Sequence, residues 1–110
     1  MTTFNDREKA FENKFAHDAE LQFKASARRN KLLGHWAAAI LGKTGDDAEE
    51  YARAVVIADL QRPGDEDVFE KVWRDLQAAA APIDQATLRA RMDALMAEAK
   101  HQIMNETPKE

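Results

Sequence analysis

The sequence predicts an all-α fold: a small four-helix bundle from which a mobile or projecting N-terminal helical arm extends. Hydrophobic residues make up 45% and charged residues 33% of the chain, with only four Gly and three Pro, a composition that favours helix throughout. Apolar residues recur at helical spacing in stretches that short turn-like segments separate. A chain of 110 residues is large enough for one modest core but not for two, which suits a bundle.

The first helical stretch covers residues 5–41 and is too long for an ordinary globular helix. We expect it to bend near His17 and Asp18, which are poor helix formers, and we expect a second weak point at Gly34. Gly42 then ends the helix. The predicted core face of this helix consists of Leu32, Leu33, Trp36 and Ile40.

The second and third helices are each expected to begin at an acidic cap. The second begins at Asp46, with Glu49 reaching back as in a capping box, and ends before a turn at residues 63–64. Asp65 or Asp67 then caps the third helix. The predicted core faces are Tyr51, Ala52, Val55, Val56 and Leu60 in the second helix, and Val68, Phe69, Val72, Trp73 and Leu76 in the third.

The fourth helix has the clearest start in the sequence. The third helix ends before Pro82, and Asp84 then stands at a cap position with Ile83 and Leu88 at the spacing of a hydrophobic staple. The polar tail from residue 105 onward is expected to fray. The predicted core face of the fourth helix is Leu88, Met92, Leu95, Met96, Ala99 and Ile103.

The N-terminal segment carries an apolar stripe of its own. On a helix, Phe11 and Phe15 each point within about 20° of the direction of Phe4. A polar stretch separates this stripe from the core face that follows, so we divide the chain into an arm of residues 1–20 and a bundle of residues 21–107. Periodicity leaves two alternatives open: the arm folds back to complete the bundle, or it binds a partner.

Magnitudes indicate what a detached arm needs in order to bind. Burial of three Phe side chains contributes roughly 4.5 to 9 kcal/mol, whereas association itself costs roughly 4 to 15 kcal/mol. Useful affinity therefore also requires polar contacts. Arg7 and Lys14 flank the Phe face, and the mixed charges of the segment suit a groove between protein subunits better than a membrane surface.

The charge balance argues against general nucleic-acid binding, because the formal net charge is −4 and the pI is about 5.4. One basic cluster, Lys24, Arg28, Arg29 and Lys31, forms either a solvated helix face or, as the alternative function, the surface of a helical protein- or nucleic-acid-interaction module. The absence of Cys excludes disulfides and thiolate metal sites. No signal segment or transmembrane stretch is recognisable, so we expect a soluble protein.

The motifs that resemble catalytic or ligand sites are incomplete. Residues 42–44 read Gly-Lys-Thr, but a phosphate-binding loop also requires Gly at the position of Ala37 and a preceding strand. Glu98 and His101 form one Glu-x-x-His pair, and a di-iron bundle requires two such pairs. We therefore predict no catalytic residue, no metal site and no enzyme activity. The remaining aromatic residues, Trp36, Tyr51, Phe69 and Trp73, are predicted to lie in the core.

Two long strings and two shorter ones carry a family resemblance. Residues 5–18 read NDREKAFENKFAHD, and residues 21–38 read LQFKASARRNKLLGHWAA. The turn PGDEDV at residues 63–68 and the Met92-Asp93 pair extend the likeness over nearly the whole chain. With these strings the chain resembles the zeta subunit of the alpha-proteobacterial F-type ATP synthase.

The resemblance implies a four-helix inhibitor of ATP hydrolysis that is not an enzyme. It implies that the N-terminal segment enters the catalytic head between the alpha and beta subunits, with gamma as a further contact, and stops rotation. It also implies a cytoplasmic location at the inner membrane without membrane insertion, no required cofactor, and weak adenine nucleotide binding as in some members. Carried onto this sequence, the contact residues of the arm are Phe4, Arg7, Phe11, Lys14 and Phe15.

Overall fold

The computed structural model describes residues 18–61 and 64–106, and these residues form helices joined by short turns. The helices are α2 (Ala19–Ile40), α3 (Gly45–Gln61), α4 (Asp65–Ala78) and α5 (Gln85–Glu106). The described ranges contain no strand, which confirms the predicted all-α class and the four bundle helices. The arm residues Phe4, Arg7, Phe11, Lys14 and Phe15 lie outside the described ranges.

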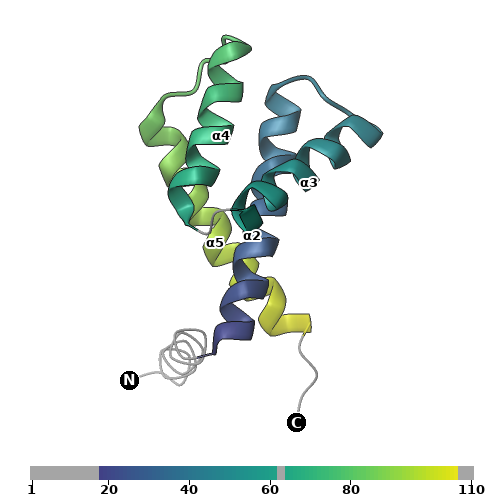
Figure 1. Cartoon of the computed structure of the whole chain (residues 1–110), viewed down its shortest axis with the longest axis vertical. Helices are drawn as coiled ribbons and strands as arrows, with labels where there is room; N and C mark the ends of the chain where they lie inside the picture. Colours follow the sequence, from purple (N-terminus) through teal and green to yellow (C-terminus); the bar gives the residue numbers. More distant parts are fainter. Residues whose placement is uncertain (1–17, 62–63, 107–110) are drawn as a thin grey trace.

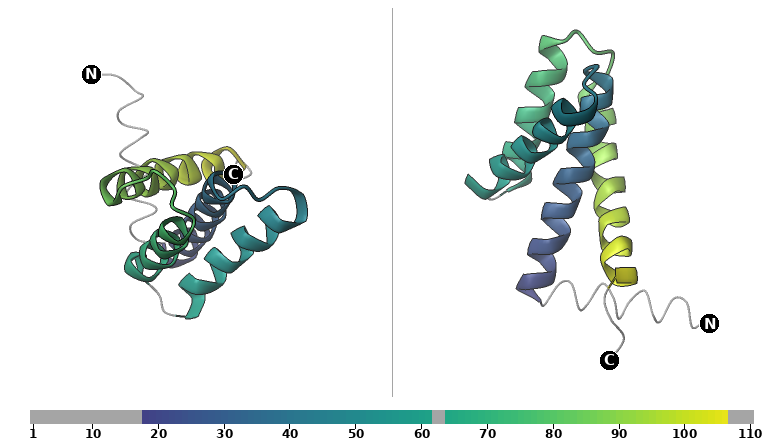
Figure 2. Two further views of the ribbon diagram at one scale, coloured as in Figure 1. Left: turned by 90° about the horizontal axis from the view of Figure 1, so that it is seen from above. Right: turned by 90° about the vertical axis from the view of Figure 1, so that its right-hand side faces the viewer.

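Helix α2 is the central element of the bundle, because it contacts each of the other three helices. It runs beside α5 in the opposite direction, so the start of α2 and the end of α5 lie at the same end of the molecule (Figures 1 and 2). Helix α3 crosses α2, and its C-terminal end leads away from α2 and α5 (Figure 2). This arrangement leaves one side of the N-terminal half of α2 uncovered.

Most of the predicted core is buried. Leu60 is exposed instead, at 54%, and it belongs to the last turn of α3. Trp36 and Trp73 cover the edge of the core and are only half-buried. The predicted core residues confirmed as buried are Leu33, Tyr51, Ala52, Val55, Val68, Phe69, Val72, Leu76, Leu88, Met92, Leu95, Ala99 and Ile103.

Gly34 lies at the closest approach between α2 and α3. Helix α2 continues unbroken through it, so the predicted second weak point is wrong. A Cβ atom on Gly34 would lie 2.5 Å from the Cα of Ala52 and 3.0 Å from its Cβ. The missing side chain therefore brings the two helix backbones together, and the glycine serves helix packing here.

Two of the predicted helix caps are wrong, and one is confirmed. Helix α3 begins at Gly45, which places Asp46 inside the first turn. Helix α4 has Gly64 at its N-cap position, which offers no side chain, and both Asp65 and Asp67 lie within the helix. At the start of α5, Oδ1 of Asp84 accepts a 2.8 Å hydrogen bond from the Thr87 backbone N–H, as predicted.

Arg29 is the partner of Asp65, and its side chain is only 2% exposed. Its Nη2 donates a 2.8 Å hydrogen bond to Asp65 Oδ1, and its Nε donates a 2.7 Å bond to Asn30 Oδ1. A buried guanidinium requires such partners, since an uncompensated charge in a core is strongly destabilising. The pair therefore fixes the first turn of α4 against the middle of α2.

The end of α2 has the geometry of a Schellman motif. The Gly42 N–H donates to the Ala39 carbonyl at 3.2 Å, and the Lys43 N–H donates to the Ala38 carbonyl at 2.9 Å. Gly42 has a φ of +80°, in the left-handed region that favours glycine. Gly42 therefore ends the helix, as predicted.

Helix α4 ends with the same motif but without a glycine. The Ala80 N–H donates to the Gln77 carbonyl at 2.9 Å, and the Ala81 N–H donates to the Leu76 carbonyl at 3.0 Å. Ala80 has a φ of +56°, which is unfavourable for a residue with a Cβ atom. The two helix ends thus place Gly and Ala in equivalent backbone positions.

Exchanging the two residues is expected to move stability in opposite directions. Gly42→Ala should lower the free energy of unfolding by about 1 kcal/mol, and Ala80→Gly should raise it by a somewhat smaller amount, because only Ala is strained at positive φ. A Cβ on Gly42 meets no atom within 4 Å, so no steric clash complicates the comparison. Urea unfolding measures both changes, and shifts of the same sign would contradict this explanation.

Candidate functional site

Asp18 marks the point where α2 begins. Its Oδ1 accepts hydrogen bonds from the backbone N–H groups of Glu20 at 3.0 Å and Leu21 at 3.2 Å. The backbone of Asp18 is extended, with φ −116° and ψ 104°, so α2 does not extend back through Asp18. The predicted break at His17 and Asp18 is confirmed at Asp18, while His17 lies outside the described ranges.

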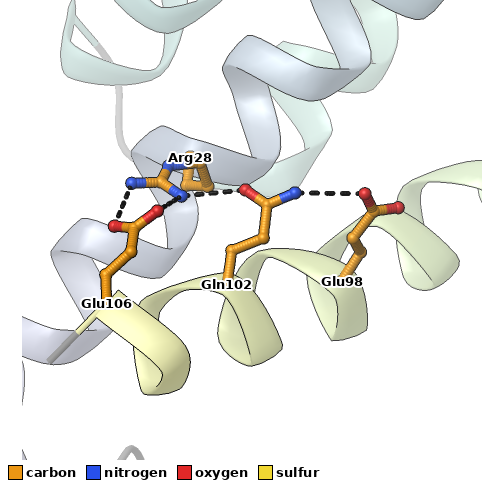
Figure 3. A network of polar contacts seen from close by, with 4 residues as sticks. All are labelled: Arg28, Glu98, Gln102 and Glu106. Carbon is orange, nitrogen blue, oxygen red and sulfur yellow. Dashed lines mark hydrogen bonds and ion pairs between the residues drawn. The ribbon is translucent and has the colours of Figure 1, made fainter.

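A polar network fastens this end of α2 to α5 (Figure 3). The Arg28 guanidinium donates through Nη1 to Glu106 Oε2 at 2.7 Å and through Nη2 to Glu106 Oε1 at 2.8 Å. Nη1 also donates to Gln102 Oε1 at 2.8 Å, and Gln102 Nε2 donates to Glu98 Oε2 at 3.1 Å. Two-pronged bonds of this kind hold geometry well. The network therefore ties the last turn of α5 to the helix that follows the arm.

Apolar contacts between α2 and α5 accompany this polar network. Ala25 and Ile103 are buried and form a small cluster separate from the main core, with Leu21 and Met96 packed against it. These residues come from the N-terminal half of α2 and the C-terminal half of α5, which lie side by side (Figure 2). The end of the bundle next to the arm is thus held by both apolar and ionic contacts.

Acid is expected to weaken this end of the bundle. The Arg28 guanidinium holds the pKa of Glu106 below its ordinary value of 4.5, because the ionised carboxylate accepts its hydrogen bonds. A carboxyl whose pKa is lower in the folded state stabilises the fold above its unfolded pKa and loses that effect as pH falls through its folded pKa. Glu106→Gln should therefore be less stable than the native chain at pH 7.

The difference in stability between the native chain and Glu106→Gln should disappear below pH 4.5, as Glu106 of the native chain becomes protonated and loses its charge. Urea midpoints measured from pH 7 down to about pH 3 test this. Glu50→Gln, which changes an exposed residue of α3, is the matched control and should show no such closing difference. A gap for Glu106→Gln that stays constant with pH would contradict the explanation.

The predicted basic cluster is not one solvated face. Arg29 is buried and paired with Asp65, and the charge of Arg28 is matched by Glu106. Lys24 and Lys31 are exposed. The structure thus assigns the two arginines to packing and leaves the two lysines on the surface.

The incomplete catalytic and ligand motifs do not become sites in the structure. Residues 42–44 follow α2 in its C-terminal motif, so the element directly before them is a helix and not the strand that a phosphate-binding loop requires. Within residues 18–61 and 64–106, no group of three or more His, Asp or Glu side chains could hold a metal ion. None of the helices in these ranges is long and apolar enough to cross a membrane.

A groove of about 590 Å³ lies where the uncovered side of α2 meets α3 and the end of α5. Phe23, which is 58% exposed, stands at this groove. Sequence reasoning missed both the groove and the Arg28–Glu106 pair, whose members are 78 positions apart. The direction of Phe23 was the available signal, since on a helix it points about 80° away from Leu33 of the core face.

The described residues form a small all-α bundle. The start of α2, which follows the N-terminal segment in the sequence, is held by the Asp18 cap and the Arg28 network. The family model for ATPase inhibitor subunit zeta matches residues 1–102, and the chain belongs to that family. A structure solved by solution NMR is similar: it is 50% identical, the match covers 79% of this chain and 99% of that one, and the TM-score is 0.69. A comparison with curated proteins found no match. Membership confirms the resemblance, and it associates the chain with ATP synthase as an inhibitor subunit.

Proposed function

We propose that the chain inhibits ATP hydrolysis by inserting its N-terminal arm into the catalytic head of the synthase between an alpha and a beta subunit. The bundle stays outside the head and sets the direction in which the arm enters. The arm stops rotation as a wedge, which requires no catalytic residue. The contact residues that we assign to it are Phe4, Arg7, Phe11, Lys14 and Phe15.

The capped start of α2 is the observation that supports this proposal most. Because the backbone of Asp18 is extended and its side chain caps the helix, α2 begins as a helix of its own directly after the proposed arm. The Arg28 network and the Ala25–Ile103 cluster hold the point of departure firmly. A wedge also needs different affinities for the rotational states of the head, since equal affinity for all states shifts nothing.

The proposal carries further expectations about partners and location. Gamma is expected as an additional contact, and binding to the head would hold the chain at the cytoplasmic periphery of the inner membrane. No nucleic acid, required cofactor or metal takes part. Weak adenine nucleotide binding stays a prediction that equilibrium dialysis with ATP can test, because no described contact assigns residues to it.

Phe11→Ala and Phe15→Ala test the arm directly. Each removes about 1.5 to 3 kcal/mol of apolar burial, so each should raise the concentration that half-inhibits ATP hydrolysis by a purified bacterial synthase head roughly 10- to 100-fold. The melting temperature should change little. Leu60→Ala is the matched control, since it removes an exposed apolar side chain that belongs to α3 and not to the arm.

Two results would contradict the arm mechanism. The first is unchanged inhibition by Phe11→Ala and Phe15→Ala. The second is a large fall in melting temperature, which would mean that the arm folds back and completes the bundle.

A further inference from the structure

The groove beside α2 has an apolar floor formed by three helices. Leu21, Phe23 and Ala27 come from α2, Val56 from α3 and Ile103 from α5. Phe23 is the largest exposed apolar side chain among the described residues, at 58% exposure. A ring left in water at the edge of an apolar groove provides contact area for a partner.

The groove is long as well as apolar. Its α2 wall extends from Leu21 to Lys31, a distance of about 15 Å at 1.5 Å per helical residue. A smaller hollow of about 200 Å³ shares Lys31 and Val56 with it and continues along α3 to Arg53. An elongated groove of this form suits a peptide segment better than a compact small molecule.

The charge of the groove is opposite to that of the whole chain. Lys24, Arg28 and Lys31 line it against a single carboxylate, Glu106, although the chain carries a net charge of −4. Arg28 and Glu106 neutralise each other in their ion pair. Lys24 and Lys31 therefore remain as exposed positive charges, two helical turns apart along the α2 wall of the groove.

We propose that this groove docks an acidic amphipathic segment of the synthase head. The inference rests on the proposed function for the identity of the partner, and it adds a second contact to that of the arm. Apolar side chains of the segment would cover Phe23 and Val56, and its carboxylates would pair with Lys24 and Lys31. Leu21 lies three residues after Asp18, so a partner that holds the arm is adjacent to the groove.

The groove favours a protein segment over a nucleic acid. Most of its lining is apolar, whereas nucleic-acid affinity depends chiefly on cations that contact phosphates. An acidic amphipathic peptide uses both the apolar floor and the two lysines.

Binding of the full-length chain to an immobilised synthase head, measured in parallel with inhibition, tests the proposal. Phe23→Ala should weaken binding about tenfold, and the double variant Lys24→Glu/Lys31→Glu should slow association about tenfold at low salt and less at high salt. Leu60→Ala and Arg74→Glu are the matched controls, because they change an exposed apolar residue and an exposed cation away from the groove. Circular dichroism confirms that each variant keeps its helices.

Native-like binding by both groove variants would overturn the proposal, as would failure of the native chain to bind the head. Gel retardation of a DNA or RNA duplex tests the alternative partner. Retardation by the native chain that is lost in the Lys24→Glu/Lys31→Glu variant would assign the groove to nucleic acid and overturn the proposal. Native binding without inhibition, with weaker binding by the groove variants, would refute the proposed function and leave the docking surface supported. Failure of the docking proposal and failure of the proposed function thus give different results.

Discussion

Replacing Gly34 with alanine is expected to lower the free energy of unfolding by about 2 kcal/mol, within the range that overpacked cores show. The added Cβ would lie 2.5 Å from the Cα of Ala52, a distance that forces the backbones of α2 and α3 apart. Gly34 is completely surrounded at this crossing, and the obstructing atom belongs to a backbone that no rotamer change can move. Gly34→Val should be still less stable.

Helix propensity alone predicts the opposite result, which makes the experiment decisive. In an exposed helix interior, alanine is more stable than glycine by about 1 kcal/mol. Ala94→Gly, at an exposed position in the interior of α5, should therefore destabilise the chain by about that amount. Urea unfolding of both variants measures the two effects, and a Gly34→Ala chain more stable than the native one would refute the close-packing explanation.

Removing Cβ from the facing residue should not restore the loss. Ala52→Gly relieves only the 3.0 Å contact to the Ala52 side chain, and the 2.5 Å contact to its Cα remains. The double variant Gly34→Ala/Ala52→Gly is thus expected to be no more stable than Gly34→Ala. Full recovery in the double variant would show that side chains, and not backbones, set the distance between α2 and α3.

The sequence predicted those parts of the fold that depend on neighbours along the chain. The apolar faces of the helices follow from a period of 3.6 residues, and the start of α5 follows from Asp84 and the spacing of Ile83 and Leu88 around it. The end of α2 at Gly42 and the break at Asp18 are likewise local properties of the backbone. Each of these predictions is confirmed.

The features that sequence reasoning missed depend on residues distant along the chain. From the sequence, Arg29 resembled one more cation of a solvated face, but in the structure it is buried and paired with Asp65 of α4. Gly34 resembled a weak point because its role is determined by Ala52 on another helix. Arg28 meets Glu106 only because α2 and α5 lie side by side. Spacing within one helix contains no information about such partners.

The candidate site also combines features that depend on local sequence with features that depend on residues distant along the chain. The Phe stripe of the arm and the lysines of α2 were visible in the sequence, whereas the groove that these lysines line depends on where α3 and α5 lie. The five arm residues chosen as contacts stay predictions. Their test requires a chain that lacks the arm but keeps every interaction of the bundle.

A chain that begins at Asp18 meets this requirement and should lose inhibition almost completely. It keeps the side-chain cap of α2, the Arg28 network and the apolar core, all of which lie at or after residue 18. Its melting temperature should therefore stay close to that of the full chain. A cut two residues later would remove the cap and confuse loss of the arm with loss of stability, since a helix N-cap is worth about 1 kcal/mol.

The central claim is that residues 1–17 carry the inhibition, and the rate of ATP hydrolysis by a purified bacterial synthase head tests it most directly. The rate should fall as the full chain is added, and it should stay at its uninhibited value when residues 18–110 are added at the same concentrations. Equal inhibition by the two chains would contradict the claim and place the inhibitory contact on the bundle.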